Sequence, residues 1–501
     1  MAYTYKVRGR TVRLNPDPGF VAVRYHDSFP NSGRARAVAA VEGLHSFETR
    51  TEVPDERLTL IPLAPPASGG PGPVAAMAAL DGQPEVAKAL PVLRFGAARA
   101  VPTERILLSL HDPARIGEVL TRHGLRELRR SEALIIAAAP DDADVFALCR
   151  ALDKDPDVIY AEPDFAIFGN RPNEQPASGA PDPMLDRQYA LTITGALDVQ
   201  AIVQGDAAIR IAVLDDGVDV GHPDLAPAVA ATYDALDQDS FQQPNDWDSH
   251  GTCCAGLAAA VAGNGLGIRG VAAGCSLVAV RLAHSREKAR NLWITSSAVM
   301  AEALRWAWKD GKADVLSNSW VAPPSGAIMD QIEAAQTQGR NGRGCVVLAA
   351  AGNEGGPVAF PASFDGVIAV AASNQFDKVK THDSADGETW WGSNHGPEIA
   401  VAAPGVANIT TSVRRKASGP GVYVDSFNGT SAATPIVAGA CALLLSLRPD
   451  LSAAQVRDLL CATADRIGPF PYKNGRNNHA GHGRINLRRA VEAAQALPPA
   501  Q

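Results

Sequence analysis

Six short apolar runs between residues 209 and 404 place the strongest constraint on the fold. They are rich in β-branched residues and read IRIAVL, SLVAVRL, DVLSNSW, CVVLAAAGN, GVIAVAA and EIAVAAP. Ala-rich segments of helical character separate them. Continuous apolar runs indicate strands buried on both faces, and strands that alternate with helices form parallel sheets covered by helices. The sequence therefore predicts one large α/β domain with a doubly wound, mostly parallel sheet, ending near residue 495.

The composition of the 501 residues limits the classes of partner. The 46 Lys and Arg against 54 Asp and Glu give a net charge of −8, without a basic tract of the kind that binds nucleic acid. No apolar run follows the positively charged N-terminal residues, and the other apolar stretches are broken by Gly and Pro. We expect a cytoplasmic protein without nucleic-acid or membrane partners, with export by a non-classical route left open.

The seven cysteines have spacings that match no disulfide framework. Two of them are adjacent in HGTCCAG, residues 250–256, shortly after a histidine. This segment suits a metal site, a redox pair or part of a hydrolase. Zinc sites usually have CxxC or CxxH spacing, and adjacent side chains diverge on a helix or a strand. The better supported interpretation is a pair of small buried thiols.

The N-terminal third contains an internal duplication. LDGQPEVAKALPVLRFG at 80–96 is similar to LDKDPDVIYAEPDFAIFG at 152–169, and a matching series of apolar runs and helical segments precedes each. Each copy predicts the order strand, helix, strand or hairpin, helix, strand, and we expect a ferredoxin-like α+β unit. The Pro-rich segment NRPNEQPASGAP is typical of a linker. The predicted domains are 1–98, 99–169, a linker at 170–181, and 182–501.

Four chemically distinctive motifs lie where predicted strands end and helices begin. IRIAVLDDG ends a strand at Asp215, HGTCCAG opens a helix at His250, CVVLAAAGN ends a strand before Asn353, and GTSAATP opens a helix at Ser431. A serine hydroxyl becomes nucleophilic when an imidazole takes its proton, and a carboxylate orients that imidazole. An amide donor stabilises the oxyanion that forms on an attacked carbonyl.

Taken in order, LDDGVDVGHPDL, HGTCCAG, AAGNEG and NGTSAATP resemble the four signatures of the subtilisin-like serine proteases, over about residues 182–495. The resemblance implies a serine endopeptidase that works through an acyl-enzyme. It implies that Asp215 is the triad acid, His250 the base, Ser431 the nucleophile and Asn353 the oxyanion donor. It also implies an extended peptide substrate bound along two segments: Ser319, Trp320, Val321 and Ala350, Ala351, Gly352.

Some positions depart from the common pattern of this family. The family usually has Ser or Thr where Asp216 stands and Gly where Val321 stands. Asp216 and the segment YDALDQD are similar to the kexin and furin branch. The acidic cluster with which that branch selects paired basic residues has no counterpart here, so we do not expect dibasic cleavage. Cys254 resembles the buried cysteine of the thiol-containing subtilases.

The resemblance further implies a structural calcium site. Asp224 and Asn264 match two oxygen ligands of the family's tight site, and backbone carbonyls come from the VAGNGLGI loop. Taken alone, each of these two residues also suits an ordinary turn or helix cap. The full candidate set is Asp182, Gln188, Asp224, Val261, Asn264, Leu266 and Ile268.

Residues 104–169 resemble a subtilase propeptide, which assists folding and inhibits the active site. We therefore expect a zymogen that cleaves itself between about 167 and 181. The first N-terminal unit is a second folding aid, a regulatory module or a partner-binding surface. An alternative from another class is a regulatory protein whose catalytic domain stays inhibited. A catalytically dead scaffold is disfavoured because all four chemical positions are filled.

Overall fold

The computed structural model describes residues 3–498, except for 8, 27–28, 48–49, 54–56, 64–71, 96–97, 132–133, 141–142, 171–183, 200, 287–288 and 414–421. The chain forms two compact units. The first comprises Met1–Phe168 with Ser296–Ala298 and Pro323–Ala327, and the second comprises Gly169–Thr295, Val299–Ala322 and Ile328–Gln501.

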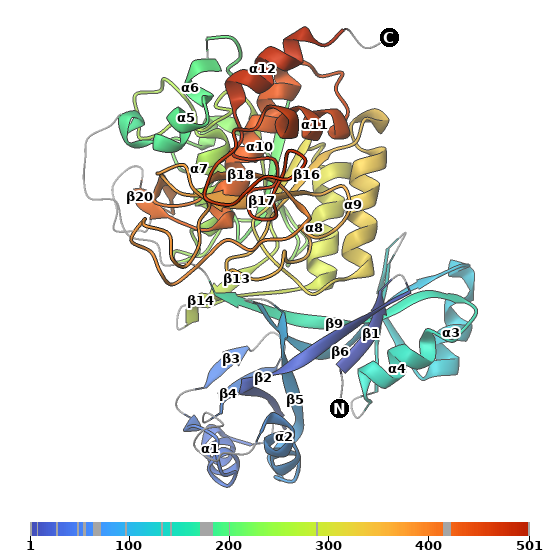
Figure 1. The fold of residues 1–501 in the computed structure, drawn as a ribbon. Helices are drawn as coiled ribbons and strands as arrows, with labels where there is room; N and C mark the ends of the chain where they lie inside the picture. The colour runs from blue at the N-terminus through green and yellow to red at the C-terminus, as the bar shows by residue number, and fades with distance from the viewer. Residues whose placement is uncertain are drawn as a thin grey trace. The chain divides into compact units, whose positions relative to one another are not determined.

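The first unit contains two copies of one arrangement, which confirms the duplication predicted from the sequence (Figure 1). The first copy is β2 (Arg10–Tyr25), α1 (Asn31–Ala39), β3 (Thr51–Val53), β4 (Leu58–Pro62), α2 (Pro73–Asp81) and β5 (Val86–Phe95). The second is β6 (Ala98–Leu110), α3 (Ile116–His123), β7 (Arg126–Arg130), β8 (Ile135–Ala138), α4 (Val145–Leu152) and β9 (Val158–Asn170). A further strand, β1 (Tyr3–Val7), pairs with β2.

Strand order is the same in both copies. It is β3-β4-β2-β5 in the first and β7-β8-β6-β9 in the second, with all pairs antiparallel. This is the ferredoxin-like order expected from the sequence, and β5 pairs with β6 to join the copies into one sheet. In the first copy, apolar side chains of both helices pack against one face of the strands; they include Ala37, Val38, Met77 and Leu80.

The second unit is built on a seven-stranded parallel sheet with the order β11-β12-β10-β15-β16-β17-β18. Its strands are β10 (Arg210–Asp215), β11 (Val229–Asp234), β12 (Ser276–Arg281), β15 (Val315–Asn318), β16 (Val346–Ala350), β17 (Ile368–Ser373) and β18 (Ile399–Pro404). Each of the six apolar runs forms one strand, so the predicted parallel sheet is confirmed. The sequence reasoning missed β11, whose residues VAATYD are half polar and lie at the sheet edge.

Helices cover both faces of this sheet. The helices are α5 (Tyr189–Ile193), α6 (Ala196–Val199), α7 (His250–Ala259), α8 (Ser297–Lys309), α9 (Gly326–Gln338), α10 (Thr430–Leu447), α11 (Ala453–Thr463) and α12 (Leu487–Ala496). Core residues of α7, α10, α11 and α12 cluster with one set of alternating strand residues, whereas α8 and α9 lie side by side on the other face (Figure 1). Short 3₁₀ turns at Leu185–Arg187, Ala226–Ala228 and Arg340–Gly342 complete the helical elements of the unit.

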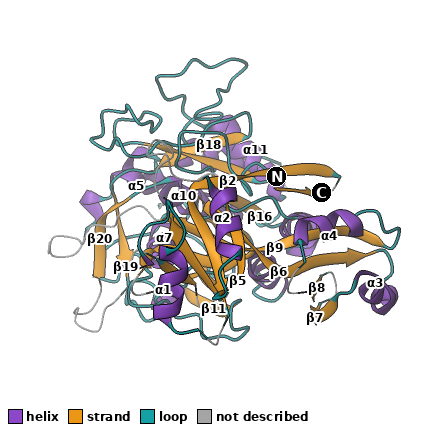
Figure 2. Cartoon of the chain, turned by 90° about the horizontal axis from the view of Figure 1, so that it is seen from below, coloured by secondary structure: helices purple, strands orange, loops and turns teal. Residues whose placement is uncertain are grey.

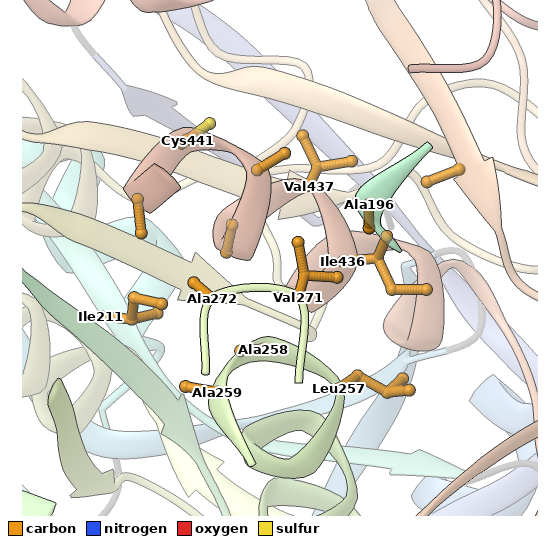
Figure 3. Close-up of a cluster of buried hydrophobic side chains, with 14 of the residues drawn as sticks. Ala196, Ile211, Leu257, Ala258, Ala259, Val271, Ala272, Ile436, Val437 and Cys441 are labelled. Carbon is orange, nitrogen blue, oxygen red and sulfur yellow. The ribbon is translucent and has the colours of Figure 1, made fainter. Parts of the chain in front are cut away.

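The two helices that carry catalytic candidates pack closely. Figure 3 shows Leu257 and Ala258 of α7 beneath Ile436 and Val437 of α10. A β-carbon at Gly439 would lie 2.7 Å from Cβ of Val271 and 3.0 Å from the carbonyl oxygen of Ala258, so a larger residue there would force the neighbouring backbone to shift. Among the described helices, α10 alone is long and apolar enough to cross a membrane, and 89% of it is buried inside the fold, as in a core helix.

Two hairpins extend the unit: β13 (His284–Arg286) with β14 (Ala289–Ser296), and β19 (Asn408–Ser412) with β20 (Val422–Phe427). In Figure 2, β19 lies beside α7. The hydroxyls of Thr410 and Thr411 donate hydrogen bonds to the carbonyl oxygens of Cys253 and Thr252 on that helix, both at 2.7 Å. The β19–β20 hairpin is thereby attached to the helix that begins at His250.

The order of the strands also predicts where a site belongs. The chain leaves β10 toward β11 on one side of the sheet and leaves β15 toward β16 on the other. Connections that diverge in this way open a crevice at the carboxyl ends of the two strands, where α/β proteins bind ligands. Asp215 is the last residue of β10, and Ser319 directly follows β15.

Candidate active site

Asp215 and His250 form a buried pair at this crevice. Nδ1 of His250 lies 2.8 and 2.9 Å from the two carboxylate oxygens of Asp215. The residues are 7% and 5% exposed. Burial, the largest single contribution, lowers the pKa of His250, but the contributions of the Asp215 carboxylate and of Cys254 together outweigh it, so the pKa lies well above its ordinary value. The carboxylate both orients the ring and stabilises its protonated form.

The first turn of α7 is held by the residue next to Asp215. The backbone N–H of Gly251 donates to Oδ1 of Asp216 at 2.7 Å, and the N–H of Asp216 donates to Oδ1 of Asp215 at 2.8 Å. A carboxylate suits a helix N-terminus because the N–H groups there carry partial positive charge. A β-carbon at Gly251 would lie 2.3 Å from the carbonyl oxygen of Gly217. These contacts fix the position of His250 relative to Asp215.

Ser431 is the second residue of α10 and is 6% exposed. The thiol of Cys254 lies 4.0 Å from Nδ1 of His250 and 3.6 Å from the carbonyl oxygen of Ser431, so both residues adjoin the same sulfur atom. Among the described residues, the Ser431 hydroxyl donates to the carbonyl oxygen of Ser319 at 3.3 Å rather than to His250. Rotation about the Cα–Cβ bond redirects it, and such bonds commonly tighten only when substrate binds.

Asn353 follows β16 and approaches the start of α10. Its Oδ1 accepts hydrogen bonds from the N–H of Thr430 at 2.8 Å and from the Thr430 hydroxyl at 3.0 Å. These contacts assign the amide orientation and leave Nδ2 as the outward donor. A β-carbon at Gly429 would lie 3.3 Å from Asn353 Nδ2 and 3.5 Å from the backbone nitrogen of Ser431. Two N–H donors therefore border one space that the glycine leaves open.

The two predicted substrate segments leave neighbouring strands at this edge. Asn318 of β15 is opposite Ala349 of β16, so Ser319–Val321 and Ala350–Gly352 start side by side. Ser319 also donates its hydroxyl to the carbonyl oxygen of Ser431 at 3.0 Å. Trp320 is 7% exposed, so its ring is packed inside the unit, whereas Val321 is half-buried.

Burial raises the pKa of the Cys254 thiol to about 11, although His250 opposes the shift. At neutral pH the group is a protonated thiol. Asp215, His250 and Cys254 offer ligand atoms within 4.8 Å of one another, but Nδ1 of His250 and the Asp215 carboxylate oxygens are already engaged with each other. The site chemistry therefore favours the buried-thiol interpretation of HGTCCAG.

The candidate calcium ligands converge around Asp224, which is fully buried. Its Oδ1 accepts from Nδ2 of Asn264 at 2.7 Å, and its Oδ2 accepts from the N–H of Ile268 at 3.0 Å and from the hydroxyl of Tyr423 at 2.8 Å. The amide of Gln188 makes two hydrogen bonds of 2.8 Å with the backbone of Arg269.

Val261 and Leu266, which are predicted to bind calcium through backbone groups, lie in the loop that contains Asn264 and Ile268. The N–H of Val261 donates to the carbonyl oxygen of Asp224 at 2.9 Å, and the N–H of Leu266 donates to Oδ1 of Asn264 at 2.9 Å. Asp182 lies outside the described residues. The other six candidates therefore lie on the 261–268 loop, or are hydrogen-bonded to it or to the following residue, Arg269.

Sequence reasoning missed two residues beside the candidate oxyanion donor: Thr430, which orients Asn353, and Gly429, which leaves the space beside Asn353 open. It also missed Tyr423, which contacts Asp224 at the candidate calcium site. The position of Thr430 directly before Ser431 was the available signal. Tyr423 comes from a strand 199 residues away from Asp224, and no local pattern indicates that contact.

Comparisons with known proteins show which family the chain is similar to. Residues 206–483 match the Subtilase family, Peptidase_S8. A calcium-dependent protease of a Nostoc species is 30% identical over 543 residues, covering 97% of this chain and 78% of that protein. Subtilisin E of Bacillus subtilis is 31% identical over 391 residues, covering 77% of this chain and 88% of that protein.

A solved structure shares the fold. Fervidolysin from Fervidobacterium pennivorans, described as a keratinolytic enzyme related to subtilisin, superposes with a TM-score of 0.60 at 22% identity. The similarity covers 79% of this chain and 61% of that one.

Proposed function

The chain belongs to the subtilase family and is a serine endopeptidase that acts on protein substrates, and from this premise we propose that Asp215, His250 and Ser431 are its catalytic triad. The observation that carries the proposal is the pairing of His250 with Asp215 at 2.8 Å, beside the start of the helix bearing Ser431. Asn353 and the backbone N–H of Ser431 would supply the oxyanion donors, because both border the space beside Gly429.

The reaction then proceeds in two steps. Oγ of Ser431 attacks the peptide carbonyl carbon while His250 takes the hydroxyl proton through Nε2. The imidazolium is stabilised by Asp215, and the developing oxyanion by the Asn353 amide. Collapse of the intermediate breaks the C–N bond, and His250 gives its proton to the leaving amine. Water, deprotonated by His250, then hydrolyses the acyl-enzyme and restores Ser431.

Binding of substrate as an extended strand accounts for how the scissile carbonyl reaches this position. The segments 319–321 and 350–352 leave adjacent parallel strands and offer main-chain groups to a peptide laid between them. Fixing the peptide through its backbone positions the carbonyl carbon near Ser431 irrespective of most side chains. Selectivity then depends on the pockets beside these two segments.

We propose that Ca²⁺ binds at the 261–268 loop. The carboxylate of Asp224, the amide oxygens of Asn264 and Gln188, and carbonyl oxygens of the loop are the hard donors that this ion prefers. Bound there, the ion would neutralise the buried Asp224 carboxylate. Its contribution would be to stability, since the site lies apart from the atoms that react. The name of the Nostoc relative, a calcium-dependent protease, supports the proposal.

The N-terminal region would act as a propeptide, so that the protein is made as a zymogen. The match to subtilisin E covers 77% of this chain, more residues than 182–501 contains, so it extends into the second N-terminal unit. That unit has a compact ferredoxin-like arrangement of its own. Self-cleavage between about 167 and 181 would separate it from the catalytic domain; most of that window lies outside the described residues.

Two experiments test these assignments. Alanine variants of Asp215, His250 and Ser431 should each lower kcat by at least ~10⁴-fold, and the losses should not add when the changes are combined, since the residues act as one unit. Purified wild type should yield a fragment whose N-terminus lies between 167 and 182, while Ser431→Ala remains at full length. Additive losses, or processing of the Ser431→Ala variant on its own, would contradict the proposal.

A further inference from the structure

A lysine is completely buried in the segment between β17 and β18. The side chains of Lys380 and Asp386 are both 0% exposed, and Nζ of Lys380 lies 3.0 Å from Oδ1 of Asp386. Lysine is almost never fully buried unless it is paired, because its ammonium group is strongly hydrated in water. Because neither side chain reaches the surface, the pair does not contribute to solubility and must have another role in the folded protein.

The ammonium group lies in a cage of oxygen atoms. Nζ contacts the carbonyl oxygen of Thr381 at 2.9 Å, Oγ of Ser384 at 3.1 Å, Oδ1 of Asp386 at 3.0 Å and the carbonyl oxygen of Glu388. The ring of Trp391 covers it, with its centroid 5.1 Å from Nζ. Four oxygens exceed the three protons of an ammonium group, so Lys380 acts as a central positive charge for the loop.

The segment from 374 to 394 also closes on itself around Asp386. Oδ2 of Asp386 accepts from Nδ2 of Asn374 at 2.9 Å and from the hydroxyl of Ser384 at 2.7 Å. Burial raises the pKa of Asp386. These hydrogen bonds and the contact with Lys380 lower it by more than burial raises it, so the pKa lies below its ordinary value. The carboxylate is therefore ionised and paired at neutral pH.

One end of this cage reaches the helix that carries Ser431. The carboxylate of Glu388, whose own carbonyl contacts Lys380, accepts from Nε1 of Trp391 and from Nδ2 of Asn428 at 2.8 Å. Asn428 directly precedes Gly429, which leaves open the space between the two oxyanion donors. The cage therefore fixes the turn just before α10.

The other end of the cage reaches Asn353. The N–H of Gly392, the residue after Trp391, donates to the carbonyl oxygen of Asn353 at 3.1 Å. The N–H of Asn394 donates to the carbonyl oxygen of Gly352 at 2.9 Å. The segment that surrounds Lys380 thus holds both backbones that carry the oxyanion donors.

We propose that Lys380 is a positioning residue for the oxyanion donors, a built-in cation that fixes the 374–394 segment between Asn353 and Asn428. The inference rests on the proposed role of Asn353. Without the ammonium group, the buried Asp386 carboxylate loses its counter-ion, and the carbonyl oxygens of Thr381 and Glu388 lose a hydrogen-bond donor. Removing one member of a buried ion pair costs far more than replacing the whole pair with apolar side chains. The segment would rearrange, and both donors would move with it.

The test compares Lys380→Met with Lys378→Met, which removes an exposed lysine two residues earlier. Complete loss of one oxyanion donor lowers kcat by on the order of 10²–10³-fold. Lys380→Met retains both donors and displaces them only in part, so it should lower kcat by roughly 10–100-fold, with KM within about twofold. Affinity for a peptidyl boronate should fall in parallel, while affinity for the matching product peptide stays unchanged. Lys378→Met should remain within about twofold of wild type in every measurement.

A second variant covers the case in which Lys380→Met does not fold. Glu388→Gln keeps the carbonyl that contacts Lys380 but offers one acceptor to the two donors Trp391 and Asn428. It should fold and show a smaller loss of kcat and boronate affinity in the same direction. Folded Lys380→Met with wild-type kcat and boronate affinity overturns the inference, as does wild-type behaviour of Glu388→Gln. A failure of the proposed role of Asn353 would be distinguished by Asn353→Ala, which would then leave kcat unchanged.

Discussion

Replacement of Gly429 by alanine tests the oxyanion site at its most confined point. The residue has φ of +106°, where an L-residue is strained at a cost of about 1–3 kcal/mol. The new methyl group would lie 3.3 Å from Nδ2 of Asn353 and 3.5 Å from the nitrogen of Ser431. It would therefore narrow the space that both donors border, and interference with two donors should reduce kcat/KM by at least ~10²-fold.

The matched control separates strain from obstruction. Gly342 also has a positive φ, +83°, and a β-carbon there meets nothing within 4 Å, so Gly342→Ala places an L-residue at positive φ without new contacts. Thermal unfolding measures the loss of stability in each variant, and kinetics with a peptide substrate, at a temperature where both are folded, should show loss of activity only in Gly429→Ala. Equal activity of Gly429→Ala and Gly342→Ala, at matched stability, would refute the assignment of this space to the oxyanion.

Three further predictions concern the imidazole, the thiol and the calcium site. The raised pKa of His250 means that kcat/KM rises with pH through a value above 6.5, and Asp215→Asn should move this acid limb to lower pH while lowering the rate by on the order of 10⁴-fold. Because protonated His250 pairs with Asp215, its contribution to the unfolding free energy is complete below its unfolded pKa and is lost as pH rises through its higher folded pKa. The difference in unfolding free energy between wild type and Asp215→Asn should therefore shrink between these two pKa values. A difference that stays constant over this pH range would contradict the pairing. A mercurial should inactivate the wild type, because bulk on Cys254 would displace both His250 and Ser431, and Cys254→Ala should be resistant while remaining active. Calcium at 100 times its Kd should raise the unfolding free energy by about 2.7 kcal/mol, and Asp224→Asn should abolish most of this gain; an equal gain in the variant would exclude the loop as the site.

Much of the architecture follows from patterns visible in the chain. Six apolar runs predict six buried parallel strands because a strand covered on both faces has no polar side. The duplication predicts two similar N-terminal units because matched runs recur in one order. The sequence pattern did not predict β11, because half-polar residues at a sheet edge give little periodic signal.

The site was less accessible to sequence reasoning than the fold. The roles proposed for Asp215, His250, Ser431 and Asn353 came from motif resemblance. No spacing reveals that His250 contacts Asp215, 35 residues before it, or that the thiol of Cys254 contacts Ser431, 177 residues after it. Lys380 lies two residues before HDSADGETWWG, a polar stretch that suggests an exposed loop. Its burial depends on oxygen atoms that only the folded segment brings together.

In the proposed mechanism, Ser431 is the nucleophile and His250 activates it. The most direct measurement is the site of labelling by a fluorophosphonate probe on the purified protein, read by peptide mass spectrometry. Labelling should give one adduct, on Ser431, formed rapidly in wild type and at least ~10³-fold more slowly in His250→Ala. An adduct on another residue, or equally fast labelling of Ser431 without His250, would contradict it.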